Sequence, residues 1–120
     1  MQESARGFVK RSSDIEEMPM EGGAGIRWLI THRDGADNYS MRLINIKKDK
    51  STPYHSHDYE HEIFVVDGSL DVTIGEKKSQ APRDSFIFIP PNAFHGMTAT
   101  VDTRLICVVP VKAARKILGD

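Results

Sequence analysis

Short apolar segments recur along the chain, and in most of them apolar residues alternate with polar ones. The segment 70–74 is the clearest case, because Leu70, Val72 and Ile74 alternate with Asp71 and Thr73. This period of two is typical of a β-strand with one buried face and one face in water. Gly, Pro, Asp and Asn separate the segments. Short strands with such breaks between them predict an all-β sandwich or barrel.

The pattern divides the chain into three parts. Residues 1–25 are polar, end in a glycine-rich stretch and predict an N-terminal arm with one short strand at 7–10. Residues 26–111 predict the barrel, and residues 112–120 a tail or short helix. Asp67-Gly68 predicts a two-residue hairpin. The expected strands cover 26–31, 39–48, 61–66, 70–74, 86–89 and 103–109.

Two expected strands, 63–66 and 86–89, are apolar at every position. Such strands must be covered on both faces, whereas a small barrel covers only the inner one. A second sheet, the N-terminal arm or a partner subunit must cover the outer face. We therefore expect a homodimer formed through sheet faces or strand exchange, with the arm contributing.

The composition is that of one globular domain. The chain has 120 residues, of which 39% are hydrophobic and 28% charged, with a formal net charge of −1. This balance argues against a nucleic-acid or membrane-surface partner. No apolar run approaches the roughly 20 residues of a membrane span, and residues 1–10 lack the apolar core of a secretory signal. With a single cysteine, no intrachain disulfide can form, and we expect a cytoplasmic protein.

Four of the five histidines are arranged as candidate metal ligands. His55, His57 and His61 fall within seven residues, and His95 lies 34 residues after His61. Side chains two apart on a strand share a face, so His55 and His57 can bind one ion. The alternative is solvated or core histidine, but four at this spacing favour a first-row divalent metal. His32, the fifth, is expected on the surface.

The first histidine segment resembles the first motif of the cupin family. That motif runs His-x-His, three or four residues, Glu, six residues, Gly. His55, His57 and Gly68 match it, and six residues separate His61 from Gly68. His61 therefore occupies the place where many cupins have glutamate.

The segment around His95 resembles the second cupin motif. Pro90 and His95 match, whereas Asp84 and Asn92 stand at the two glycine positions and Ala99 replaces the terminal asparagine. Asp and Asn are the residues other than glycine that best tolerate a left-handed backbone. We therefore expect the backbone shape of the motif to be kept at both positions.

The resemblance covers roughly residues 26–110 and implies the cupin double-stranded β-helix, or jelly-roll barrel. With His61 in place of glutamate, the chain resembles the small single-domain manganese cupins, whose site has four histidines. This implies one divalent metal per chain, Mn first and Fe next. Zn, Ni, Co and Cu are expected as substitutes.

Five further residues are candidates for a substrate pocket, each with an alternative role. Arg42 would pair with an anionic substrate if it faces inward, and would otherwise be a surface arginine. Cys107 shares its strand parity with Leu105, and lies either near the metal or in the core. Tyr59 and Phe94 adjoin ligands in sequence, as pocket walls or as core.

Neutral ligands leave the ion its full positive charge, which favours anionic oxygen donors such as carboxylates, diketonates and enolates. We therefore expect a Mn- or Fe-dependent oxygenase, or a related lyase or decarboxylase, acting on a small oxygen-rich, anionic molecule. A non-catalytic metal-dependent sensor or ligand carrier is the main alternative. A structural protein stapled by its metal is a third possibility. No general base is obvious near the motifs, which argues against a hydrolase or epimerase.

Overall fold

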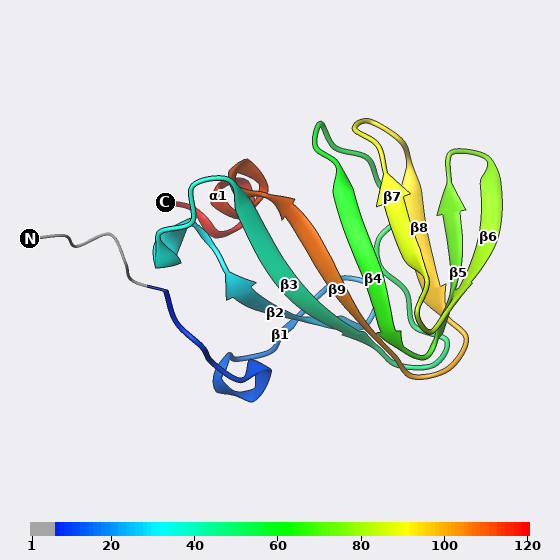
Figure 1. Cartoon of the computed structure of the whole chain (residues 1–120). Coiled ribbons are helices and arrows are strands. Elements are labelled where there is room, and N and C mark those ends of the chain that lie inside the picture. Colours follow the sequence, from blue (N-terminus) through cyan, green and yellow to red (C-terminus); the bar gives the residue numbers. More distant parts are fainter. Residues whose placement is uncertain (1–6) are drawn as a thin grey trace, which may run out of the picture.

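Two antiparallel β-sheets face each other and enclose the core in the computed structural model, which describes residues 7–120 (Figure 1). The larger sheet has the strand order β1-β2-β3-β9-β4-β7, and the smaller has the order β6-β5-β8. This confirms the expected all-β, jelly-roll fold. The strands are β1 (Met18–Pro19), β2 (Ala24–Ile30), β3 (Tyr39–Ile46), β4 (His61–Asp67), β5 (Ser69–Ile74), β6 (Lys77–Pro82), β7 (Phe86–Ile89), β8 (His95–Ala99) and β9 (Thr103–Pro110).

Three short helical segments complete the fold. Two are 3-10 turns, η1 (Ser12–Asp14) and η2 (His32–Asp34), and one is the C-terminal helix α1 (Val111–Leu118). No helix in residues 7–120 is long and apolar enough to cross a membrane. Within residues 7–120, helical structure is therefore confined to the two ends and to the connection between β2 and β3.

Alternating burial explains how the strands hold the core. In β4, His61, Ile63 and Val65 are buried, whereas Glu62 and Phe64 are exposed. The buried positions face the small sheet, whose core residues include Leu70 and Val72. The period of two in the sequence thus sets which side chains point between the sheets.

The link between β4 and β5 differs from the expected hairpin. The two strands lie in different sheets, so Asp67-Gly68 carries the chain from one sheet to the other. Gly68 has φ +94°, and a Cβ there would lie 2.4 Å from Thr103 Oγ1. Glycine is needed because the crossing chain passes directly against β9.

Two cupin-motif positions adopt the expected backbone. Asp84 has φ 72° and Asn92 has φ 69°, both in the left-handed region. Asp and Asn therefore take the role that glycine has in the motif.

Two local expectations are wrong. Strand β6 was not expected, because residues 77–80 are polar and exposed at the edge of the small sheet and show no apolar alternation. Residues 7–10 form no strand. Strand β6 forms because it pairs with β5, although its own sequence lacks the alternation of a strand.

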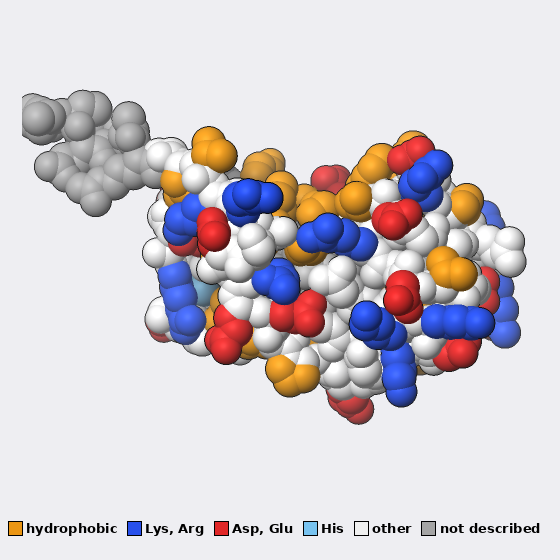
Figure 2. All heavy atoms as spheres, turned by 90° about the horizontal axis from the view of Figure 1, so that it is seen from below, with side chains coloured by type: hydrophobic (Ala, Val, Ile, Leu, Met, Phe, Trp, Pro, Cys, Tyr) orange, Lys and Arg blue, Asp and Glu red, His pale blue; other side chains and the backbone are white. Residues whose placement is uncertain are grey.

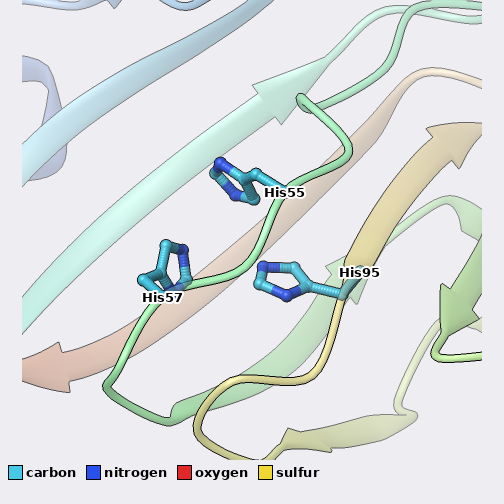
Figure 3. Close-up of side chains that lie close together, drawn as sticks. All are labelled: His55, His57 and His95. Atoms are coloured by element: carbon cyan, nitrogen blue, oxygen red, sulfur yellow. The ribbon is translucent and has the colours of Figure 1, made fainter.

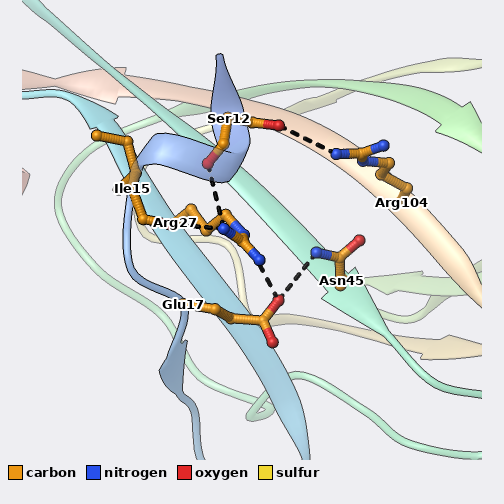
Figure 4. Close-up of polar contacts among 6 residues, drawn as sticks. All are labelled: Ser12, Ile15, Glu17, Arg27, Asn45 and Arg104. Carbon is orange, nitrogen blue, oxygen red and sulfur yellow. Dashed lines mark hydrogen bonds and ion pairs between the residues drawn. The ribbon is translucent and has the colours of Figure 1, made fainter. Parts of the chain in front are cut away.

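The N-terminal segment, residues 12–17, packs on the outer face of the large sheet (Figure 4). Arg27 Nη1 donates to the carbonyl oxygens of Ser12, at 3.2 Å, and Ile15, at 2.6 Å. Asn45 Nδ2 donates to Glu17 at 2.9 Å, and Arg104 Nη2 donates to the Ser12 hydroxyl at 3.2 Å. The segment therefore covers β2, β3 and β9.

The part of this outer face on β4 and β7 carries three exposed phenylalanines. Phe64, Phe86 and Phe88 are 45%, 85% and 55% exposed, and Phe64 is paired with Phe86 across β4 and β7. Seen from below, hydrophobic side chains gather along one long edge of the molecule (Figure 2). Among the described residues, nothing covers these phenylalanines, and the homodimer stays a prediction.

We expect light scattering at micromolar concentration to give a dimer for the intact chain and a monomer for Phe86→Glu. A charge on the exposed ring position would have to be buried without a partner in the interface. Val101→Glu, which changes an exposed apolar residue between β8 and β9, is the control and should remain dimeric. A monomeric wild type would contradict the expectation.

Candidate metal centre

Backbone pairing brings the two histidine segments together. The amide of His55 donates to the carbonyl of His95 at 3.0 Å, and the amide of His95 donates back at 2.9 Å. The Asn92 amide also donates to the His57 carbonyl at 2.7 Å. His55 and His57 lie in the loop before β4, not in a regular strand as expected. The backbone hydrogen bonds to the His95 segment, and not a regular strand, fix the directions of the His55 and His57 side chains.

The side chains of His55, His57 and His95 converge (Figure 3). Each offers one ring nitrogen, and the three nitrogens lie within 4.8 Å of one another. Two come from the loop and one from the start of β8, so the cluster joins both motifs. Three imidazole nitrogens this close could hold one metal ion, and imidazole suits first-row transition metals.

Burial keeps these imidazoles neutral. It is the main cause that lowers the pKa of His57 to about 4 and the pKa of His61 to about 2. It also lowers the pKa values of His55 and His95. The positive charge of Arg42 acts in the same direction on all four. Neutral rings at neutral pH have a lone pair free for a metal.

His61 lies beside the three-histidine cluster, at the start of β4. Its Nε2 is 3.3 Å from His57 Nε2, and its Nδ1 is 3.1 Å from Arg42 Nη2 and 3.3 Å from Cys107 Sγ. If Nδ1 accepts from Arg42, the ring proton is on Nε2 and His61 is no ligand. If Nδ1 donates to the sulfur, Nε2 is free to bind metal. The fourth ligand therefore stays a prediction.

Arg42 faces inward from β3 and is 6% exposed. Its Nη2 donates to Cys107 Sγ at 2.9 Å, and its guanidinium lies 5.1 Å from the centre of the Trp28 ring. The Nε atom is buried without a hydrogen-bond partner. Within residues 7–120, no carboxylate forms a salt bridge or hydrogen bond with this cation. Trp28, which no sequence signal marked, supplies a cation–π contact instead.

Tyr59 and Cys107 line the same small cavity as the histidines. The Tyr59 ring stacks on His57 with ring centres 4.1 Å apart and 5° between their planes, and so fixes that imidazole. Cys107 is 1% exposed, and burial raises the pKa of its thiol. It is therefore a neutral thiol at neutral pH.

Phe94 and Leu105 do not line the cavity, which corrects the expectation for both. Phe94 is 53% exposed and stacks on Tyr54 outside it, with ring centres 5.7 Å apart. It points outward because the chain turns inward only at the next residue, His95. Leu105 shares the inward parity of Cys107 but is fully buried in the core, paired with Ile44 and Val65.

The histidines open into a cavity of about 100 Å³. A separate open groove of about 590 Å³ lies over the small sheet, beside Tyr54 and Asp71, and contains no histidine. The cavity has no aspartate or glutamate in its lining. Besides the histidines, Arg42, Tyr59 and Cys107, its walls are formed by Met20, Ile44, Thr52, Ile63, Ile89, Met97 and Ile117.

A two-sheet jelly roll with partly or fully buried imidazoles converging from two motifs defines a class of metal-binding β-barrels. Residues 42–110 match the sequence family described as Cupin domain, which is more than half of the chain. The chain therefore belongs to the cupin family. No curated protein sequence matches it.

The solved structures of several proteins are similar to the structure of this chain. The polyketide cyclase RemF from Streptomyces resistomycificus is 28% identical with a TM-score of 0.76, over 87% of this chain and 80% of that chain. An RmlC-like cupin from Shewanella frigidimarina is 18% identical (TM-score 0.77, 87% and 90% covered). KdgF from Halomonas sp. is 15% identical (TM-score 0.77, 87% and 93% covered). The last two likenesses show the fold alone.

We expect His57→Ala to lose most of the bound metal, because it removes one of the three converging nitrogens. His32→Ala is the matched control, since His32 contacts the Gly119 carbonyl far from the cluster in sequence and lies outside the cavity. Elemental analysis of both purified proteins measures the metal content. Equal metal in His57→Ala and wild type would refute the assignment.

The metal-free protein should lose stability as the pH falls below about 6.5. The unfolded chain then binds protons that the buried histidines do not, so the free energy of unfolding decreases towards the folded pKa of His57, about 4. Urea unfolding in chelator at pH 7.5 and pH 5 measures the decrease. His57→Gln should show a smaller decrease in the free energy of unfolding. An equal decrease in wild type and His57→Gln would show that protonation of His57 is not the cause.

Proposed function

We propose that this protein is a metal-dependent cupin enzyme that binds a small anionic, oxygen-rich molecule and acts as an oxygenase on it. The observation that carries the proposal is the buried Arg42 guanidinium, which faces the histidine cavity without an acidic partner.

The cavity carries positive charge that its own residues leave uncompensated. Taking a cation out of water is costly unless an anion or several hydrogen bonds replace the solvent. Among the described residues, the Arg42 guanidinium has the Cys107 sulfur, the His61 ring and the Trp28 face as partners, and its Nε makes no hydrogen bond. A carboxylate or enolate would give the guanidinium a charge-assisted hydrogen bond. The same anion would be favoured by a divalent ion held by neutral imidazoles.

His55, His57 and His95 would hold the ion, with His61 as the proposed fourth ligand. His61 would then carry its proton on Nδ1 and donate it to Cys107 Sγ, which lies 3.3 Å away. We propose manganese as the native metal and iron as the next choice. When bound, such a metal supplies Lewis acidity and redox capacity. Tyr59 stacks on His57 and so orients that ligand from behind.

The reaction type is open to a direct test. The metal-loaded chain should consume oxygen with a small diketone or 2-oxo acid, and His57→Ala should not. Binding of the anion without oxygen uptake would favour a non-catalytic sensor or carrier. Product formation without oxygen uptake would favour a non-oxidative reaction, a possibility that the 28% identity to a polyketide cyclase supports.

We expect Arg42→Met to weaken oxalate binding to the manganese-loaded protein by about tenfold or more, because a charge-assisted bond is lost. The metal's spectroscopic signal reports the titration. Binding of a neutral alcohol of similar size should be weaker than oxalate in wild type and unchanged in the variant. Arg83→Met, on an exposed arginine outside the cavity lining, is the control. Equal oxalate affinity in Arg42→Met and wild type would show that the charge of Arg42 does not contribute to anion binding.

A further inference from the structure

Two residues near the two ends of the chain complete the wall of the histidine cavity. Met20 lies between β1 and β2, and Ile117 lies in α1 near the C-terminus. Ile117 lines the cavity although it is 54% exposed. A side chain that contacts both the cavity and the solvent stands at the boundary between them. Met20 is partly exposed and packs against the core beside it.

The helix that carries Ile117 is anchored at both ends. At its start, Val111, Ala113 and Ala114 are buried. At its end, the Arg33 side chain donates to the Leu118 carbonyl, and His32 Nε2 lies 2.7 Å from the Gly119 carbonyl oxygen. These contacts with η2 hold the last turn of α1, so Ile117 has a fixed place at the cavity and is not the tip of a loose tail.

The space behind this boundary is small. The cavity measures about 100 Å³. A water molecule takes about 30 Å³ of liquid volume, and a cavity of about 150 Å³ accommodates benzene. The cavity in its observed state therefore accepts a few non-hydrogen atoms beside the histidines, and an aromatic ring exceeds it.

We propose that Met20 and Ile117 form the mouth of the metal centre and restrict its ligands to acyclic carboxylates or enolates of about two or three carbon atoms. This inference rests on the proposed function and specifies its substrate class. The inner groups, Arg42 and the imidazoles, select for negative charge, whereas the two apolar side chains at the mouth select for size. Shortening Ile117 widens the opening without touching any group that binds the ion or the anion.

The test compares a small and an aromatic carboxylate, acetate and benzoate, on the full chain loaded with manganese. Each is titrated into wild type, Ile117→Ala and Met20→Ala, and the metal's spectroscopic signal is followed. Lys116→Ala is the matched control, because it changes an exposed residue of the same helix that does not line the cavity. Thermal unfolding of each variant verifies that the fold is kept.

Wild type should bind acetate and exclude benzoate. Ile117→Ala should bind benzoate about tenfold or more tightly than wild type does, with acetate binding unchanged, and Lys116→Ala should behave as wild type. Ile117→Trp should slow the association of acetate. Equal benzoate binding in wild type and Ile117→Ala would overturn the inference, and so would a gain in benzoate binding of the same size in Lys116→Ala. If acetate still bound in these cases, the proposed function would stand. If no carboxylate changes the signal in any variant, the proposed function itself fails, and the inference with it.

Discussion

The pair of backbone hydrogen bonds between His55 and His95 is the contact on which the rest of the site depends. It joins a loop that precedes β4 in the large sheet to the first residue of β8 in the small one. The bond from the Asn92 amide to the His57 carbonyl adds a second tie between the same segments. Convergence of the three imidazoles follows from this pairing, because each ring projects from a backbone that the opposite segment holds in place. The site is thus built where the two sheets meet.

Charge in the cavity follows from burial. Desolvation keeps the imidazoles neutral, so they add no charge that could compensate Arg42. The guanidinium is held by the Trp28 face and the Cys107 sulfur, which are weak partners for a buried cation. On the proposed function, an anionic ligand would complement both Arg42 and a bound divalent ion, and the mouth proposed at Met20 and Ile117 would select it by size.

Local backbone conformation was predictable from the sequence, whereas contacts between segments far apart in the sequence were not. Asp84 and Asn92 have the left-handed backbone that their place in the motif predicted. Gly68 was expected in a hairpin but links two sheets, because long-range pairing decides where β5 goes. The direction of Arg42 was ambiguous, since both faces of β3 are covered and apolar residues occur at both parities. Ile117 could not be foreseen at the cavity, because its position depends on how α1 folds back on β3 and β9.

We propose that one divalent ion binds among the histidines that the two motifs bring together. Anomalous diffraction from crystals of the manganese-loaded protein would locate this ion. We expect one peak per chain, within about 2.0–2.3 Å of a ring nitrogen of each of His55, His57 and His95. A further contact with His61 Nε2 would establish the fourth ligand. No peak in this cavity, or a peak at another site with the three rings unligated, would contradict the account.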